Sequence, residues 1–347
     1  NSVRDCLNAK LGSEVKTAGR IMSWRGIGKI VFSDLMDFAG RIQLVFQLGE
    51  TTNKDFDFFN RYIDVGDIVG VEGKIFKTKT GQKSILVKSL KLLTKSILPL
   101  PDKWHGLQDK EERYRKRYLD LIMNPQIREV FGIKRKIFDS LREFMKSRDF
   151  QEVETPILQP IYGGTNARPF SSELNALGGM KVYMRISNEM YLKRLIVGGY
   201  EKIFEFSTDF RNEGIDRLHN PEFTQMETMW AYADYKDNMK FAEEMISHVA
   251  KKIHGKTKIK IQDREMDFKT PWKKMKFLDA IKKETGTDFS KTKDLNEARK
   301  LAKKMEIDTS KCDTIGEVMV AVFEEKVQGK IIQPTIVYDY PLEAAGL

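Results

Sequence analysis

The sequence predicts an α+β protein in which a small N-terminal β-barrel precedes a larger domain, an antiparallel sheet flanked by helices. Five strand-like runs separated by polar turns occupy residues 15–93. A second region, residues 200–235, alternates apolar and charged side chains as two paired strands would. Apolar residues at helical spacing lie before and after this region. At 347 residues the chain is long enough for two domains with separate cores.

The N-terminal β domain has a characteristic order of elements. Its strand-like runs lie at residues 15–24, 29–36, 41–48, 67–76 and 84–93. A helical stretch at 54–62 lies between the third and fourth runs, and this is the layout of an OB-fold barrel, which commonly binds single-stranded nucleic acid. In the third run Gln43 alternates with Ile42 and Leu44, so we expect Gln43 to face outward, available to a base edge. Phe32, on the preceding run, is either a stacking platform for a base or a core residue.

The boundary between the domains is marked by proline. Residues 99–112 contain Pro99 and Pro101 and few periodic apolar positions, as a linker does. We therefore expect a first domain at 1–98 and a second at 113–347.

Composition limits the class of protein. The formal charge of +10 favours a polyanionic partner, although a lysine-rich proteome would give the same value. Cys6 and Cys312 lie far apart and match no metal spacing, which indicates free thiols in a reducing compartment. No apolar run approaches the length of a membrane span and no secretory leader is visible, so we expect a cytoplasmic protein without a membrane partner.

The region 200–235 predicts a hairpin with one charged face. Alternation places Arg211 and Glu213 on one face if the first strand runs on to Glu213. On the returning strand Phe223 and Glu227 share a face, and His219 lies in the loop between the strands. If the charged faces coincide, a guanidinium, two carboxylates and an aromatic ring meet there. Such a set suits a nucleoside triphosphate and a small zwitterion, whereas Arg211 and Glu213 alone could be a surface ion pair.

Two helical regions flank this hairpin. Residues 124–149 predict an amphipathic helix, followed by a strand at 150–157, and the helix stripe could be buried within one subunit or between two. After the hairpin, helix-like stretches lie at 238–253, 278–285, 295–304 and 314–328.

Several motifs resemble those of one enzyme family. FRNEG followed by HNPEFTQMET resembles motif 2 of the class II aminoacyl-tRNA synthetases, and AYADY resembles the lysine enzymes among them. AGRIM, FKTKTG and LKLLTK are similar to the anticodon-binding domain of the lysyl-tRNA synthetases. The resemblance implies an OB-fold anticodon-binding domain and a class II core with motif 1 at about 127–157, motif 2 at about 200–230 and a helical insertion at about 236–330. Motif 1 implies a homodimer.

The resemblance implies roles for individual residues. Arg211 would hold the ATP α-phosphate and the substrate carboxylate, as the catalytic residue. The other ATP-binding residues would be Glu213 at the adenine amino group, His219 at the γ-phosphate, Phe223 stacked on adenine, and Asn220. Lysine would be bound by Gly164, Glu189 at the α-amino group, Arg211, and Glu227. The tRNA anticodon would be bound by Arg20, Phe32 and Gln43.

Four positions depart from the family pattern. Ser89 stands where the family usually has a glutamate, which weakens the expectation of an identical anticodon contact. Met229 stands where a tyrosine is usual, and Ala345 and Gly346 replace a serine and a proline. A related or altered amino-acid substrate therefore stays open beside L-lysine.

The reaction implied is the ATP-dependent attachment of L-lysine to tRNA(Lys) through a lysyl-adenylate, with Mg²⁺. The family's third motif and its magnesium ligands are not found in this sequence, so we expect them beyond Leu347, in an incomplete enzyme whose given chain holds no metal ligands. A non-catalytic or altered-specificity paralogue that binds RNA is the alternative. A third reading, an enzyme that lysylates a translation factor, is disfavoured by the barrel at 15–93, which those enzymes lack.

Overall fold

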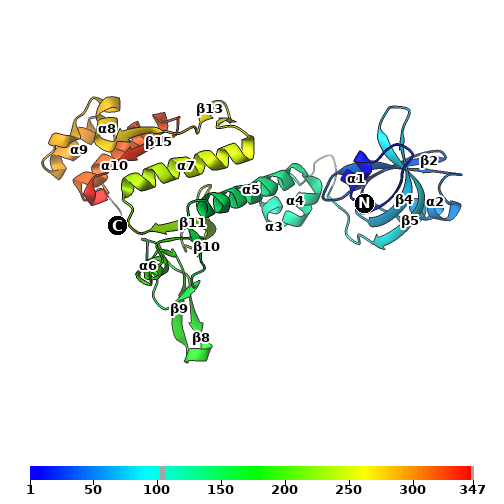
Figure 1. The fold of residues 1–347 in the computed structure, drawn as a ribbon, viewed down its shortest axis with the longest axis horizontal. Helices are drawn as coiled ribbons and strands as arrows, with labels where there is room; N and C mark the ends of the chain where they lie inside the picture. Colours follow the sequence, from blue (N-terminus) through cyan, green and yellow to red (C-terminus); the bar gives the residue numbers. More distant parts are fainter. Residues whose placement is uncertain (102–106, 345–347) are drawn as a thin grey trace. The chain divides into compact units, whose positions relative to one another are not determined.

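The computed structural model describes residues 1–101 and 107–344. The chain divides into two compact units, Asn1–Glu129 and Val130–Leu347 (Figure 1). The linker predicted at 99–112 includes residues 102–106, which lie outside the described residues. No helix within the described ranges is long and apolar enough to cross a bilayer.

The first unit contains a closed barrel of five strands in the order β1-β2-β3-β5-β4. The strands are β1 Glu14–Ile27, β2 Ile30–Met36, β3 Arg41–Gln47, β4 Ile68–Lys77 and β5 Lys83–Thr94. Helix α2, Asn53–Tyr62, lies between β3 and β4 in sequence, so the predicted order of an OB-fold is confirmed. Phe46 of β3 and Phe59 of α2 stack with ring centroids 4.0 Å apart in the barrel core.

Glycine allows β4 and β5 to approach closely. A Cβ at Gly73 would lie 2.2 Å from the backbone oxygen of Leu86, closer than any side chain can approach. The pairing of β4 with β5 shifts register between Glu72 and Gly73, and such bulges help a sheet to close. Three further helices belong to this part of the chain: α1 Val3–Asn8, α3 Lys110–Arg115 and α4 Arg117–Met123.

The second unit is built on the sheet β11-β10-β6. Its strands are β6 Gln151–Glu152, β10 Lys202–Phe210 and β11 Glu222–Trp230, and its neighbouring helices are α5 Gln126–Lys146 and α7 Tyr235–His254. The predicted helix at 124–149 is confirmed as α5, whereas the strand predicted at 150–157 is reduced to β6. A core of Phe144, Phe150, Phe204 and Phe241 joins α5, α7 and β10.

A small second sheet lies beside α6. It has the order β7-β9-β8, with β7 Leu158–Gln159, β8 Ser171–Leu174 and β9 Met180–Met184, and α6 spans Glu189–Val197. In Figure 1 the β8–β9 hairpin projects away from α6 and β10. The sequence pattern did not predict β7 or β8.

The helices predicted after the hairpin are confirmed, and three of them have their own core. They are α8 Phe277–Thr285, α9 Leu295–Lys303 and α10 Ile315–Lys326, which Figure 1 shows gathered together. Phe277, Val318 and Val322 are among the fully buried residues between them. The short strands here were not predicted: β12 Lys258–Ile261 pairs with β13 Arg264–Asp267, and β14 Lys273–Lys276 runs parallel to β15 Thr335–Tyr338.

Candidate active site

The β10–β11 hairpin has one apolar and one charged face, as predicted. In its register Glu205 pairs with Glu227, and Asp209 pairs with Phe223. Because side chains alternate along a strand, these four residues share one face, which we call the polar face. The opposite face carries Phe204 and packs into the core. The apolar face therefore anchors the hairpin, and the polar face is available for chemistry.

Arg211 and Phe223 lie together at the end of the hairpin. The backbone N–H of Arg211 donates to Pro221 O at 2.9 Å, one step beyond the last strand pair. Its guanidinium carbon lies 5.0 Å from the centroid of the Phe223 ring, and its Nε donates to Ile186 O at 3.4 Å. This geometry presents a cation beside an aromatic face, which suits a phosphate next to a base.

The condition for Arg211 and Glu213 to share a strand face, that the first strand runs on to Glu213, is not met. Strand β10 ends at Phe210, and the N–H of Asn212 donates to Arg168 O at 2.7 Å, outside the hairpin. This bond to another segment turns the chain away from β11. Glu213 is exposed in the loop, where its Oε1 accepts from Arg168 N at 3.4 Å.

The loop between the strands is ordered by Asp216. Its Oδ1 accepts the backbone N–H groups of Leu218 at 2.6 Å and His219 at 2.8 Å. His219 is exposed, and its Nδ1 lies 2.8 Å from Asp216 Oδ2. The bond from Leu218, followed by the bonds from His219, lowers the pKa of Asp216. Asn220 and Phe223 both line a cavity of about 280 Å³ beside this loop.

Ser187 lies between two carboxylate-bearing residues. Its Oγ accepts the N–H of Glu189 at 3.1 Å and donates to Glu227 Oε1 at 3.5 Å. The other oxygen of Glu227, Oε2, is buried and has no hydrogen-bond partner among the described residues. Burial, followed by the charges of Asp209 and Glu189, raises the pKa of Glu227. A buried, unpaired carboxylate oxygen is a suitable place for a cationic substrate group.

Gly164 lies against the same residues. Its φ of +92° favours glycine, and a Cβ there would lie 2.9 Å from Ser187 Oγ and 3.2 Å from Glu189 Cβ. Glu189 is 7 % exposed and pairs with Lys193 at 2.5 Å on helix α6. The structure therefore brings Gly164, Glu189 and Glu227 together around Ser187.

A buried hydrogen-bond network around Glu205, on the polar face, was not predicted from the sequence. Glu205 is 3 % exposed and accepts hydrogen bonds from Thr155, Arg185 and Asn188. Thr155 lies 50 residues from Glu205 in the chain, and Arg185 and Asn188 lie 20 and 17 residues from it, so no local pattern could identify these partners. The one available signal was the position of Glu205 on the charged side of the alternation.

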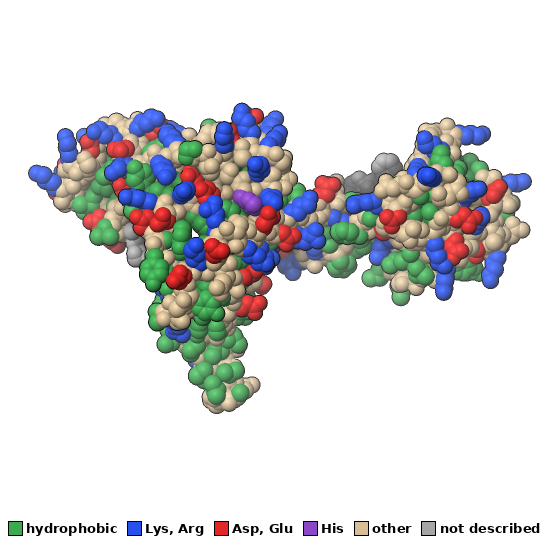
Figure 2. All heavy atoms as spheres, viewed as in Figure 1, with side chains coloured by type: hydrophobic (Ala, Val, Ile, Leu, Met, Phe, Trp, Pro, Cys, Tyr) green, Lys and Arg blue, Asp and Glu red, His purple; other side chains and the backbone are tan. Residues whose placement is uncertain are grey.

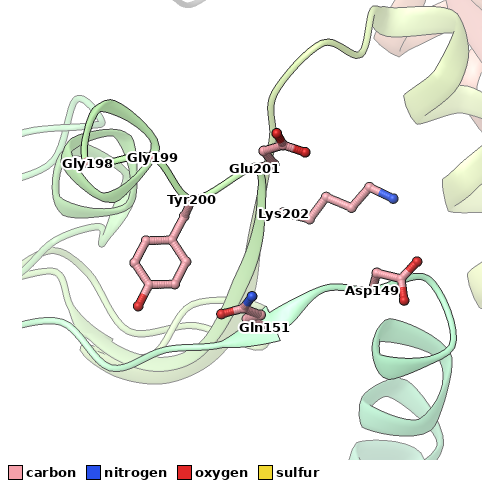
Figure 3. Close-up of a pocket in the computed structure, with 7 residues that line it drawn as sticks. All are labelled: Asp149, Gln151, Gly198, Gly199, Tyr200, Glu201 and Lys202. Atoms are coloured by element: carbon pink, nitrogen blue, oxygen red, sulfur yellow. The ribbon is translucent and has the colours of Figure 1, made fainter.

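A larger cavity, of about 550 Å³, lies at the other end of the hairpin (Figure 3). It is lined by Asp149, Gln151, Gly198, Gly199, Tyr200, Glu201 and Lys202. Lys202 begins β10 and Arg211 follows its end, so they are separated by about 30 Å of extended chain. None of the predicted site residues lines this cavity, and we assign the candidate site to the polar face.

On the barrel, Phe32 lies outside the core. It is half-buried, and the guanidinium carbon of Arg25 lies 5.5 Å from its ring centroid. The cross-strand register places Phe32 opposite Val45, two residues from Gln43 on the same face. The two readings of Phe32 are thus resolved in favour of a surface aromatic. Arg20 is half-buried, and its Nη1 donates to Gly66 O at 2.6 Å.

The prediction that Gln43 faces freely outward is wrong. Gln43 is only 8 % exposed, because β5 packs alongside β3 and covers it. The Oγ of Ser84 donates to Gln43 Oε1 at 2.9 Å. This bond occupies the side-chain oxygen of Gln43, so the amide nitrogen is the remaining polar group of this side chain.

The positions that depart from the family pattern have different surroundings. Met229 pairs with Ile203 on the polar face, two residues from Glu227. Ser89 pairs with Glu72 and lines a groove of about 420 Å³ on the barrel. Ala345 and Gly346 lie outside the described residues. Within the described residues no three His, Cys, Asp or Glu side chains are grouped to hold a metal ion.

Comparison with known proteins agrees with this geometry. Residues 109–347 match the model of the class II tRNA synthetases (D, K and N), and residues 15–93 match that of the OB-fold nucleic acid binding domain. Fold and site thus define a class II tRNA synthetase with an N-terminal OB-fold.

Curated relatives narrow the class. The lysine–tRNA ligase of Clostridium novyi is 47% identical over 99% of this chain and 68% of its own length. That of Carboxydothermus hydrogenoformans is 47% identical over 96% of this chain and 68% of its own length. The lysine–tRNA ligase of Thermoanaerobacter pseudethanolicus is 48% identical over 97% of this chain and 67% of its own length. The chain belongs to the lysine–tRNA ligase family.

Proposed function

We propose that this protein attaches L-lysine to tRNA(Lys) in an ATP-dependent reaction with a lysyl-adenylate intermediate. The observation that carries the proposal is the polar face of β10–β11. It presents a guanidinium beside an aromatic ring at one end and a carboxylate with an unpaired oxygen further along. The curated relatives of this chain that are named lysine–tRNA ligase support the same reaction.

In the first step an oxygen of the lysine carboxylate attacks the α-phosphorus of ATP, and pyrophosphate leaves. Arg211 contacts both the carboxylate and the α-phosphate and neutralises the charge that develops between them. Phe223 stacks on adenine, and Glu213 accepts from the adenine amino group. His219 and Asn220 are proposed further contacts of the nucleotide. No side-chain nucleophile is required, because positioning supplies much of the rate.

The amino acid is selected by its two ammonium groups. Glu189 accepts from the α-amino group, and Glu227 accepts from the ε-ammonium group. The unpaired, buried oxygen of Glu227 supports this assignment, because a substrate without a cation would leave the carboxylate desolvated and unpaired. Gly164 lets the backbone of its loop approach the substrate closely.

In the second step a ribose hydroxyl at the 3′ end of the tRNA attacks the lysyl carbonyl and releases AMP. The barrel binds the anticodon through Phe32, Gln43 and Arg20. The half-buried ring of Phe32 beside Arg25 supports base stacking, and the nearby Gln43 amide suits a base edge.

Magnesium is proposed as a partner of the ATP phosphates, where it would neutralise their charge. The described residues do not offer a set of metal ligands, so we assign no step to it. The proposed place of the reaction is the cytoplasm, where proteins are made.

We further propose that the protein is a homodimer. On α5, Val130 is 59 % exposed and Ile133 is 43 % exposed. Figure 2 shows further hydrophobic side chains over the β8–β9 hairpin, where Leu177 and Met180 are exposed. A second copy of the chain would cover this apolar surface.

The experiment is ATP–pyrophosphate exchange by the full-length protein with a panel of amino acids. We expect lysine to support exchange and arginine and methionine not to, because neither places a primary ammonium at Glu227. Exchange without an amino acid requirement, or exchange that prefers an uncharged amino acid, would reject the proposal. The panel also tests whether Met229 alters the choice of amino acid.

A further inference from the structure

Glu205 and Glu227 lie directly opposite each other on the polar face, but their hydrogen bonding differs. Glu205 accepts four hydrogen bonds: from Thr155 N at 3.1 Å, Thr155 Oγ1 at 2.7 Å, Arg185 Nη1 at 2.8 Å and Asn188 Nδ2 at 2.9 Å. Since a carboxylate has about four lone-pair sites, Glu205 has none left for a substrate. Glu227, in contrast, keeps an unpaired oxygen among the described residues. The two carboxylates therefore have different tasks.

The partners of Glu205 come from two separate segments, the loop after β6 and the short connection between β9 and α6. Thr155 follows β6, Arg185 follows β9, and Asn188 immediately precedes α6. Arg185 also donates to Thr155 O and to Thr208 O, both at 3.0 Å. Through these bonds Glu205 ties the start of α6 and the loop at Thr155 to strand β10.

The start of α6 carries Glu189. Its backbone N–H donates to Ser187, and the hydroxyl of Ser187 donates to Glu227. The position of Glu189 relative to Glu227 thus depends on how the segment 187–189 is held against the hairpin. Asn188 is fully buried, and its bond to Glu205 fixes this segment.

We infer that Glu205 is a positioning residue that sets the length of amino acid the site accepts. It does so by fixing the separation between Glu189 and Glu227. This inference rests on the proposed function, in which these two carboxylates hold the α-amino and ε-ammonium groups. Their separation then corresponds to the number of methylenes between the two cations, and ornithine, one methylene shorter than lysine, is too short to reach both.

Glu205, Arg185 and Asn188 are buried, so a change at one of them affects the hydrogen bonds of the others. In a Glu205→Gln variant an amide NH₂ replaces an accepting oxygen, so at least one buried donor faces another donor. Relief of that conflict requires Asn188 or Arg185 to move. The movement changes the separation of the two carboxylates without removing either of them.

The test compares kcat/KM for lysine and for ornithine in ATP–pyrophosphate exchange by the full-length protein. One methylene commonly changes selectivity by about 10- to 200-fold, and we expect Glu205→Gln to lower the lysine/ornithine ratio about tenfold. A purely structural role would reduce the amount of folded enzyme, which lowers both values equally and leaves the ratio unchanged.

A milder variant provides a second test. Asn188→Ala removes the single bond between the α6 start and Glu205, and we expect the ratio to fall about threefold, as for the loss of one hydrogen bond. If Glu205→Gln does not fold, the lysine/ornithine ratio of Asn188→Ala tests the inference instead. The matched control is Arg142→Gln, because Arg142 lies over the Phe206 ring on the opposite face of the hairpin and should leave the ratio unchanged.

The failures are distinguishable. Lysine/ornithine ratios within twofold of wild type in the folded variants would overturn this inference alone. A wild-type protein without lysine-dependent exchange would overturn the proposed function and this inference together.

Discussion

The two faces of the β10–β11 hairpin differ in function: one packs into the core, and the other carries carboxylates. On the apolar face Phe204 is fully buried and packs with Phe144 and Phe150 in the core. On the polar face Asp209 is also fully buried, but burial raises the pKa of this carboxyl. Glu227 on the same face lacks a partner for one oxygen among the described residues. One face contributes stability, whereas the other holds charge that a ligand can neutralise, which is how binding sites commonly differ from cores.

The largest effect on the polar face is expected for Arg211→Ala. Loss of the guanidinium leaves the developing charge at the α-phosphate without its cation, so lysine-dependent exchange should fall by about 10³-fold or more. Thermal unfolding should change little, because Arg211 lies outside the core. Arg142→Ala, on the opposite face, is the control that should retain exchange. Wild-type exchange in Arg211→Ala would remove this residue from the mechanism.

On the apolar face, Phe204→Ala should lower the free energy of unfolding by about 3–5 kcal/mol, because it leaves a cavity in the core. Urea unfolding measures this value. Exchange per folded molecule should stay near that of wild type, which sharpens the division between the faces. Phe38→Ala is the matched control, since this phenylalanine is exposed and its loss should cost less than about 0.5 kcal/mol. Equal losses in the two variants would contradict the assignment of the core.

Glu227→Gln should raise the KM for lysine about 100-fold, since the ε-ammonium loses a desolvated anionic partner worth about 3 kcal/mol. The KM for ATP should change much less. Glu201→Gln, an exposed residue before the start of β10, is the control for the loss of a carboxylate. If the KM for lysine is unchanged in Glu227→Gln, another group recognises the side chain of the amino acid.

The same variant tests how the ionised carboxylate of Glu227 affects the free energy of unfolding at different pH values. Because the folded-state pKa of Glu227 is raised, the unfolded state loses this proton first as pH rises, and folding is penalised above the unfolded pKa of about 4.3. Glu227→Gln should therefore be more stable than wild type by about 1 kcal/mol at pH 8. The difference should vanish below about pH 4, where Glu227 is protonated in both states. Unfolding curves at the two pH values decide this, and equal differences would argue against a titrating Glu227.

The barrel contains a similar contrast, between an aromatic residue in the core and one at the surface. Phe46 is fully buried, whereas Phe32 is half-buried beside Arg25. Phe32→Ala should weaken tRNA(Lys) binding by about 1–3 kcal/mol with little loss of stability, because a stacked base loses its platform. Tyr62→Ala, an exposed aromatic on α2, is the control. Equal affinities of Phe32→Ala and wild type in a filter-binding assay would exclude the stacking role.

Local periodicity predicted much of the fold. The faces of β10 and β11, the barrel strands and helices α5 and α7–α10 follow from alternation or helical spacing within one segment. The parallel pair β14–β15 was not predicted, because both strands have only four residues, β14 is mostly lysine, and the three-helix core separates them in the sequence. The apolar cluster of α8–α10 likewise depends on contacts between segments.

The site was predictable only in part for the same reason. Alternation placed Phe223 and Glu227 on one face, but the end of β10 depends on Arg168, a distant residue that accepts from Asn212. Gln43 alternates as an outward residue should, yet Ser84 on β5 covers and bonds it. The hydrogen bonds of Glu205 come from two segments distant in the sequence, so alternation along β10 could not reveal them. The alternation of one strand indicates which way a side chain faces. It does not indicate which hydrogen-bond partners that side chain has.

The proposed ligand of the polar face is a lysyl-adenylate. The most direct measurement is calorimetric titration of the full-length protein with a non-hydrolysable lysyl-sulfamoyl adenosine. We expect tight binding by wild type and by Arg142→Ala, and affinity at least about 100-fold weaker for both Arg211→Ala and Glu227→Gln. Equal affinity across all four proteins, or no binding by wild type, would show that the polar face does not bind a lysyl-adenylate.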